Sequence, residues 1–455
     1  MIRIFVLFFL LLYCENLYAV DLLQVYQDAL RNDPVYQQAL AQQLSNAQGV
    51  PINLASLLPN AGVVFTPFIA KTIASGSAVN VVSLPDGASA SASSTARGYN
   101  TALTLNQPLL DFVKINKYLV AKEMAKQAQA LANAAAEDLI IRVAKAYFSI
   151  VADEENLRAA GVIRAAYKKQ YDQAYHRHKT GLTSIIDVHT AKASYEKSKE
   201  KYMTLEMMLT NDKEKLHMLT KQYYPDFAIL KNRVPLINPD PNNVDQWVET
   251  AEQQNWDIKA AQYNKVAALR NIKQQTARHM PTLNLQGGYG IVFTRTIGDP
   301  IAPSTGSSKF NTSSASVSLN FPIFEGGQVV AEVDKAKYDY EVASEKLDKQ
   351  FLETIDLTKE NFYEIVARIN KIKTGASLIS ATKKSLLGME ESYRFGNENL
   401  INVLNQRENL YEAERDYIND RYLYLVNFLT LKQAAGLLSD QDVWMVNNWL
   451  NHAKN

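Results

Sequence analysis

Cysteine is almost absent from this sequence, because Cys14 is the only one among 455 residues. It lies in residues 1–19, which combine Arg3 near the start, an uncharged run over residues 4–13 and a small residue, Ala19, at the end. This pattern is typical of a secretory signal peptide, and the run is shorter than the ~20 residues of a spanning helix. We expect cleavage after Ala19, which would leave no disulfide, thiolate metal site or cysteine nucleophile.

The rest of the chain lacks both a charge excess and a long apolar run. Its 48 basic residues balance 47 acidic ones, so composition indicates no nucleic-acid partner. Charged residues soon interrupt every apolar run after the signal peptide, so we expect no transmembrane helix. A secreted chain of this kind is either soluble or crosses a membrane as β-strands, which have a weaker sequence signal.

Motifs of enzymes are missing as well. The chain has no phosphate-binding loop and no Gly-x-Ser-x-Gly elbow. His176 and His178 lie two residues apart on a predicted helix and therefore face different sides, whereas metal ligands on a helix usually lie one turn apart. We predict no enzymatic activity, no cofactor and no metal site.

Proline is missing from residues 109–224 and 323–455, which are rich in the helix-forming residues Ala, Leu, Lys, Glu and Gln. Apolar residues there recur at alternating steps of four and three, as at Leu139, Val143, Ala146 and Ile150. This spacing is typical of a coiled-coil seam. Residues 112–180 could form one helix of about 100 Å. The sequence therefore predicts a long helical bundle or tube.

Two segments of different composition, residues 59–108 and 281–322, separate the helical stretches. Apolar and polar residues alternate in them with a period of two. The apolar positions are Leu103, Leu105, Leu283, Leu285, Tyr289, Ile291, Phe293, Ala315, Val317, Leu319 and Phe321. Such alternation suits either a transmembrane barrel or a soluble hairpin with one wet face. The signal peptide favours the barrel.

The order helix, two strands, helix, helix is predicted twice, once in residues 20–243 and once in residues 244–455. Each half closes its strands with Asn-x-Pro and breaks its long helix at a glycine, Gly181 or Gly396. Four strands would leave two open edges, and each unpaired backbone group in a membrane costs several kcal/mol. Small membrane barrels start at about eight strands, so we expect several copies to share one barrel.

Several short motifs occur in the order and spacing of one known family. They are Asn32-Asp33-Pro34, Gly181-Leu182 with Asp187-Val188, Pro322-Ile323-Phe324-Glu325-Gly326-Gly327, and Ala435-Gly436-Leu437-Leu438. With them the chain resembles the TolC family of outer-membrane efflux proteins. The resemblance implies a mainly α-helical trimer with a transmembrane β-barrel portion, in which a twelve-strand barrel joins a twelve-helix tunnel. It also implies an equatorial C-terminal helix near residues 444–450.

The resemblance further implies a passive exit duct in the outer membrane, with a large periplasmic part. Such a duct conducts drugs or secreted proteins in tripartite efflux or type I secretion systems. Its partners would be two more copies of the chain, a periplasmic adaptor, an inner-membrane transporter and outer-membrane lipid. The main alternative is a soluble periplasmic coiled-coil adaptor. Adaptors usually have one helical hairpin, so the duplicated plan favours the duct.

By the same resemblance, Asp187 and Tyr393 match a hydrogen-bonding latch that closes the periplasmic end of the tunnel. Glu398 occupies the position of a latch arginine in the family pattern. Asp187 and Glu398 are both carboxylates and cannot form a salt bridge. The closed state would instead use neutral amide contacts or another basic residue, such as Arg394.

The resemblance also assigns the constriction and the docking turns. Asn402 and Asn405 occupy the positions of two pore-lining aspartates, and Glu398 could restore part of the missing negative charge. The small turns at the glycine breaks would contact the adaptor. Their residues are Gly181, Leu182 and Gly396.

Overall fold

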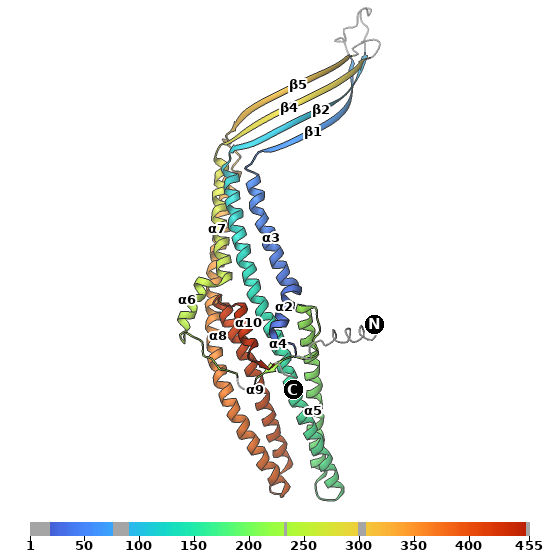
Figure 1. Cartoon of the computed structure of the whole chain (residues 1–455), viewed down its shortest axis with the longest axis vertical. Helices are drawn as coiled ribbons and strands as arrows, with labels where there is room; N and C mark the ends of the chain where they lie inside the picture. Colours follow the sequence, from blue (N-terminus) through green and yellow to red (C-terminus); the bar gives the residue numbers. More distant parts are fainter. Residues whose placement is uncertain (1–18, 76–90, 232–233, 299–305, 452–455) are drawn as a thin grey trace, which may run out of the picture. The chain divides into compact units, whose positions relative to one another are not determined.

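The computed structural model describes residues 19–75, 91–231, 234–298 and 306–451, so the predicted signal peptide lies outside the described residues except for Ala19. Figure 1 shows the elements of the first half, which are α2 (Leu22–Asn32), α3 (Pro34–Ala55), β1 (Asn60–Ser75), β2 (Ser91–Leu110), α4 (Phe112–Lys179), α5 (Ile185–Thr220) and β3 (Ile229–Leu230). The second half contains α6 (Val244–Gln254), α7 (Trp256–Thr276), a 3-10 turn (Ala277–His279), β4 (Thr282–Gly298), β5 (Gly306–Asn320), α8 (Gln328–Arg394), α9 (Leu400–Ala434), α10 (Asp440–Asn447) and β6 (Leu450–Asn451).

The expected long helices are present. α4 has 68 residues and begins at Phe112, as predicted, and its counterpart α8 has 67. Leu139, Val143 and Ile150 of the predicted seam are buried. Among the helices of the described residues, none combines the length and the apolar character that a membrane span requires.

The chain folds into two compact units, and each unit takes segments from both halves of the sequence. Of the described residues, those in the ranges 1–43, 127–262 and 346–455 make up the first unit, and those in the ranges 44–126 and 263–345 make up the second. These units are not the predicted repeats, whose boundaries stay a prediction. Tyr147 is fully buried in the core of the first unit, and its hydroxyl donates to the carbonyls of Val20 (3.0 Å) and Ala228 (2.8 Å).

The second unit contains an antiparallel four-stranded sheet in the order β1-β2-β4-β5 (Figure 1). Cross-strand register aligns Val63 with Leu103, Leu103 with Tyr289, and Leu285 with Val317. Because side chains alternate between faces, the predicted apolar positions within these strands share one face. Phe321 is an exception, since β5 ends one residue earlier, at Asn320.

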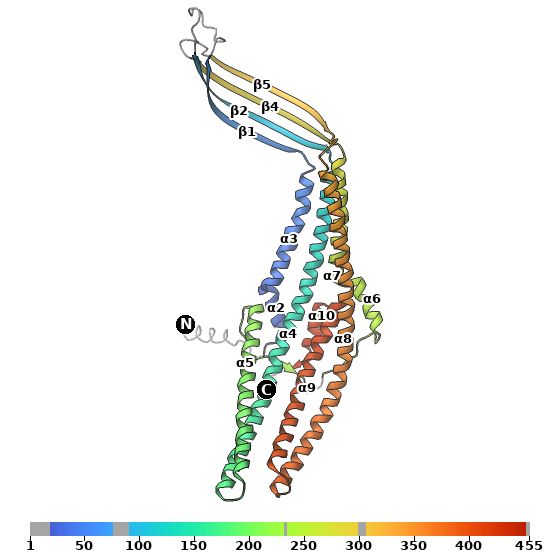
Figure 2. The same ribbon diagram turned by 180° about the vertical axis from the view of Figure 1, so that it is seen from behind.

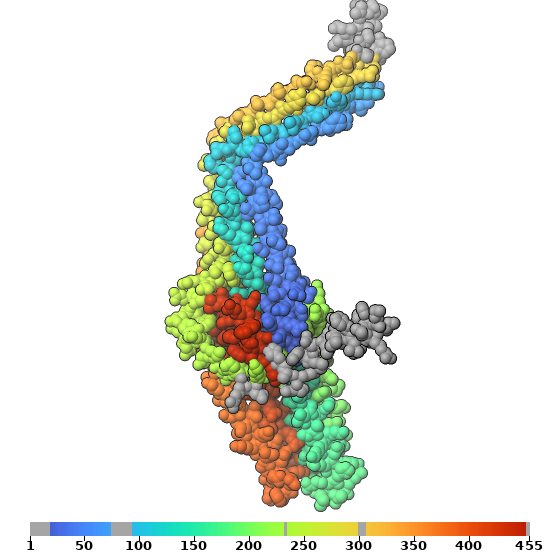
Figure 3. Space-filling view, viewed as in Figure 1, coloured from blue at the N-terminus to red at the C-terminus, as the bar shows by residue number. Residues whose placement is uncertain are grey.

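The first unit contains two helical hairpins, α4 with α5 and α8 with α9, whose turns lie at the same end of the unit (Figures 1 and 2). The short helix α10 lies beside α2 (red beside blue in Figure 3), and the Tyr26 hydroxyl donates to Asp440 at 2.7 Å. α10 begins and ends earlier than the predicted equatorial helix. Its start is fixed by a capping box in which the Asp442 carboxylate accepts hydrogen bonds from the backbone N–H and hydroxyl of Ser439.

Candidate functional site

The two hairpin turns of the first unit have the same backbone structure. In each, the N–H after the glycine donates to the carbonyl five residues earlier, and the glycine N–H donates to the carbonyl three residues earlier. The bonds are Leu182 to Arg177 (2.8 Å) and Gly181 to His178 (2.9 Å), then Asn397 to Ser392 (2.9 Å) and Gly396 to Tyr393 (3.1 Å). This helix ending requires a left-handed residue, and Gly181 and Gly396 have φ of +75° and +80°. The glycines are therefore required by the backbone conformation.

Each turn also begins the next helix in the same way. The Ser184 hydroxyl accepts from the N–H of Ile186, and the Asn399 side chain accepts from the N–H of Asn402. Leu182 is 69% exposed at the first turn, and Phe395 is 78% exposed at the second. The predicted docking residues thus lie in two hydrogen-bonded turns, each with an exposed apolar side chain, and their role in docking stays a prediction.

The predicted latch residues lie near these turns. Asp187 is in the first turn of α5, where its carboxylate accepts a hydrogen bond from the Thr183 hydroxyl. Tyr393 is half-buried in the last turn of α8, and the Arg177 guanidinium lies 5.5 Å from its ring centroid. Burial raises the pKa of Tyr393, Arg177 lowers it, and the charge of Asp187 raises it. The two residues therefore interact electrostatically, but the described chain shows no hydrogen bond between them.

Glu398 makes its polar contacts within its own hairpin. Its carboxylate accepts from the Asn399 N–H (2.9 Å) and from the Asn402 side-chain amide (2.6 Å), and both bonds lower its pKa. This neutral amide contact lies within one hairpin, and the contacts that would hold the closed state stay a prediction. The other candidate, Arg394, pairs with Glu391 of its own helix at 2.9 Å.

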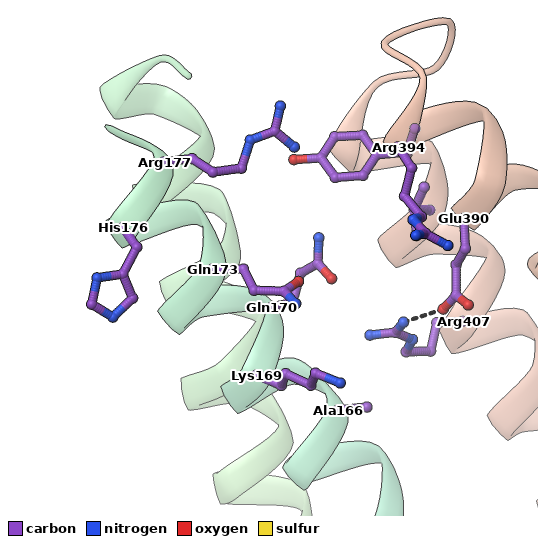
Figure 4. A pocket seen from close by; sticks show the side chains of 11 residues that line it. Ala166, Lys169, Gln170, Gln173, His176, Arg177, Glu390, Arg394 and Arg407 are labelled. Atoms are coloured by element: carbon purple, nitrogen blue, oxygen red, sulfur yellow. Dashed lines mark hydrogen bonds and ion pairs between the residues drawn. The ribbon is translucent and has the colours of Figure 1, made fainter. Parts of the chain in front are cut away.

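The two hairpins enclose a groove of about 800 Å³ between α4 and the helices α8 and α9. Figure 4 shows Lys169 and Arg177 extending into it from α4, opposite Arg394. Arg407 also lines the groove and pairs with Glu390 of α8. Most of the charged side chains of the groove wall are therefore basic, and the groove separates the hairpins next to their turns.

A cross-hairpin contact lies further along α9, at Glu408. Its carboxylate accepts from the Lys201 ammonium of α5 (3.1 Å) and from the Tyr167 hydroxyl of α4 (3.2 Å). The Lys201 ammonium also lies 4.2 Å from the centroid of the Tyr411 ring. Within the described ranges, Lys201–Glu408 is the only ion pair that joins α4 or α5 to α8 or α9.

Sequence analysis missed Glu408 because no motif marks it. Its partners come from the other half of the chain, so only the relative register of the two hairpins reveals the contact. The predicted constriction residues lie on the same helix: Asn402 and Asn405 are both exposed, and Asn405 lines a small cavity of about 90 Å³ together with Tyr167 and Glu408.

Comparison with known proteins agrees with this architecture. The model of the outer membrane efflux protein family matches residues 25–220 and 247–437. The chain belongs to this family. It is 28% identical over 437 residues to the outer membrane protein TolC of Vibrio cholerae, and the alignment covers 96% of this chain and 95% of that protein. It is 22% identical over 452 residues to the alkaline protease secretion protein AprF of Pseudomonas aeruginosa, with coverage of 96% and 89%.

The fold is also that of a solved outer-membrane channel. The crystal structure of the CmeC channel of Campylobacter jejuni matches with a TM-score of 0.71 at 21% identity, covering 94% of this chain and 90% of that one. Membership confirms the predicted family, its outer-membrane location with a large periplasmic part, and its function as an efflux and secretion channel. The alternative of a soluble periplasmic adaptor is therefore set aside.

Proposed function

We propose that three copies of this chain form the exit duct of a tripartite efflux or type I secretion system. The duct passively conducts drugs or secreted proteins from the periplasm to the exterior, and a periplasmic adaptor and an inner-membrane transporter complete the system. Secreted proteins belong among the possible cargo because relatives aligned over almost the whole chain include a protease secretion protein.

The four-stranded sheet is the observation that carries this proposal. β1 and β5 are its edges, and within the described residues each pairs with one neighbour only. Unpaired edges are not tolerated in a membrane, and closure removes them. Three sheets of this kind, joined edge to edge, would make a twelve-strand barrel.

The apolar face of the sheet has the dimensions of a membrane band. Leu283 and Phe293 mark its length on β4, which is about 34 Å along the strand at ~3.4 Å per residue. A strand tilt of about 40° reduces this to about 25 Å, the height of the apolar band of outer-membrane barrels. On β1 the same face carries Val63, Phe65 and Ile69, which are 71%, 62% and 68% exposed in the single chain. This exposure supports contact with lipid.

The tunnel helices also carry apolar side chains that one chain leaves exposed. On α5 these are Met203, Met207, Met208 and Met218, all at least half exposed. Exposed apolar patches of this kind usually mark an interface. They support packing of α5 against a neighbouring copy in a twelve-helix tunnel.

The hairpin ends would form the periplasmic gate. In this proposal Asp187 and Tyr393 restrain the closed state, while Asn402, Asn405 and Glu398 line the constriction. The turns at Gly181, Leu182 and Gly396 would receive the adaptor. The proximity of all these residues to the two hairpin turns supports this assignment.

Extraction and sizing test the assembly. The protein should leave the outer membrane only with detergent, have three times the mass of one chain by light scattering, and conduct ions in planar bilayers. A monodisperse monomer that conducts would exclude the shared barrel. A stable trimer that never conducts would exclude the duct.

A further inference from the structure

The charges of the four-stranded sheet are all of one sign. The described residues of its strands include four basic side chains and no acidic one. Each strand contributes one of them: Lys71 in β1, Arg97 in β2, Arg295 in β4 and Lys309 in β5. We call these four residues the basic cluster.

Strand register places the basic cluster on one face and in one place. Arg97 lies directly opposite Arg295. Ile69 lies opposite Arg97, and Lys71 is two residues further along β1. Lys71 is therefore the diagonal neighbour of Arg97. By the same relation Lys309 is the diagonal neighbour of Arg295. Directly opposite Cα atoms are about 4.5–5.5 Å apart and diagonal neighbours about 7–8 Å, which long side chains can span.

Among the described residues, no acidic side chain neutralises this charge. All four side chains of the basic cluster are exposed, and none of them forms an ion pair with another described residue. Like charges placed directly opposite destabilise a pair of strands. Arg97 and Arg295 therefore oppose sheet formation unless an anion lies between them.

The basic cluster also borders the apolar face described above. Tyr99 and Phe293, with ring centroids 5.5 Å apart, occupy the adjacent row on the helix side of the Arg97–Arg295 pair. Phe65 lies diagonally across from Tyr99, one row nearer the helices, with ring centroids 5.8 Å apart. Aromatic girdles of outer-membrane barrels lie at the level of the lipid headgroups. Arg97, Arg295 and Lys71 then lie just outside the girdle, towards the loop ends of the strands. Lys309 lies directly opposite Phe293, within the aromatic row.

We propose that the basic cluster binds the phosphate groups of a phosphorylated lipid in the outer leaflet. The proposal rests on the proposed function, since it requires this face of the sheet to contact lipid. Two guanidinium groups can each donate a pair of parallel hydrogen bonds to phosphate oxygens, and the two ammonium groups supply further charge. A lipid would also place its acyl chains on the adjoining apolar face, whereas a soluble anion gains nothing from that face.

Lipid titration of the detergent-solubilised trimer tests the site. The probe is bisphosphorylated lipid A, with its dephosphorylated form for comparison, and bound lipid is counted by native mass spectrometry. Arg97→Gln/Arg295→Gln should weaken binding of the phosphorylated probe at least tenfold, because charge-assisted hydrogen bonds to phosphate are lost. Lys335→Gln/Lys337→Gln is the matched control: it removes two exposed positive charges from α8 in the same unit and should leave binding unchanged.

Two further arms complete the test. Lys71→Gln/Lys309→Gln keeps the arginine pair and should weaken binding less, so the proposal can be tested even if the arginine variant fails to fold. Equal binding of phosphorylated and dephosphorylated probe, or unchanged binding in both cluster variants, would overturn the site. Inorganic pyrophosphate that binds as tightly as the lipid and displaces it would assign the cluster to a soluble anion instead.

Conductance measured on the same preparations separates this proposal from the duct itself. A cluster variant that still conducts as a trimer but has lost lipid binding supports both proposals. A wild-type trimer that conducts and binds both probes equally refutes only the lipid site. A wild-type protein that never conducts refutes the duct, whatever lipid it binds.

Discussion

The sheet of the second unit and the hairpin ends of the first unit differ in what holds them together. In the sheet, a continuous ladder aligns residues such as Val63 and Leu103, and every side chain's face follows from its position along the strand. At the hairpin ends, the hairpins meet through a small apolar cluster that includes Tyr167, Leu404 and Tyr411, and through individual pairs such as Lys201 and Glu408. The strand pairing therefore tolerates the loss of a single side chain, whereas the contact between the hairpins depends on particular side chains.

We expect the largest loss of stability where an added side chain would disrupt the backbone pairing of the strands. A Cβ added at Gly98 of β2 would lie 1.9 Å from the carbonyl oxygen of Phe293, an impossible approach to backbone atoms. Gly98→Ala should therefore destabilise the sheet by about 3 kcal/mol, at the upper end of overpacking costs. Loss of the folded trimer on unheated gels would show this.

Gly62 of β1 provides the matched control for this change. A Cβ there would lie 3.6 Å from the Thr104 hydroxyl oxygen, an ordinary contact. Gly62→Ala should assemble normally. Equal assembly of both variants would mean that the β2–β4 pairing is looser than the register indicates.

These contrasts explain how much could be predicted from sequence. The alternation of Leu283, Leu285 and Tyr289 predicted one apolar face, because a period of two allows only one arrangement of a paired strand. The long helix from Phe112 followed from the absence of proline. The basic cluster could not be recognised, since its four residues are adjacent only once the register of all four strands is known.

A second prediction concerns Glu137, a buried residue of α4 in the first unit. Burial, followed by the Asp257 carboxylate, raises its pKa from 4.5 to about 8, although Trp256 and Lys259 act in the opposite direction. A raised carboxyl pKa means that the folded state binds the proton more tightly. The stabilisation is complete below pH 4.5 and is lost as the pH rises through about 8.

The full shift corresponds to about 4 kcal/mol between pH 5 and pH 9, which we halve to about 2 kcal/mol because solvent screens the group in part. Thermal melts followed by circular dichroism should detect this loss. Glu137→Gln should remove much of the difference, because an amide does not titrate. Glu360→Gln, at an exposed position of α8, is the control and should melt like the wild type. A wild-type melt that is independent of pH would rule out a protonated Glu137 in the fold.

A third prediction concerns the cross-hairpin contact at Glu408. Glu408→Gln keeps the shape of the side chain but removes the ion pair with Lys201, whose side chain is 29% exposed. We expect the closed arrangement to lose about 1 kcal/mol, since partial exposure screens the pair. Open events in planar bilayers should become several times more frequent.

Glu412 lies one turn further along α9 at an exposed position. Glu412→Gln is therefore the matched control for Glu408→Gln and should leave the frequency of open events unchanged. Charge reversal sharpens the test: Lys201→Glu should open the channel, and Lys201→Glu with Glu408→Lys should close it again. If the double variant stays as open as the single one, the pair does not restrain the hairpins.

No sequence pattern indicated the pair of Lys201 and Glu408, and the predicted latch shows why. The family resemblance assigned Asp187 and Tyr393 one by one, from positions next to the glycine turns. In the single chain, Asp187 accepts from Thr183 and Tyr393 faces Arg177. Helix-end motifs are local and can be recognised in a sequence, whereas side-chain partners across two long helices depend on their relative register.

The smallest effect is expected at Tyr393 itself. Tyr393→Phe keeps the ring that Arg177 faces at 5.5 Å, so this cation–π contact should survive. Only the hydroxyl is lost, and with it at most one hydrogen bond to Asp187, which is about 0.5–1.5 kcal/mol. Open events should rise by roughly threefold if that bond forms in the closed trimer. Tyr393→Leu removes the ring as well and should have a larger effect. If Tyr393→Phe behaves as wild type while Tyr393→Leu opens the channel, the aromatic contact with Arg177 restrains the gate and the hydroxyl does not.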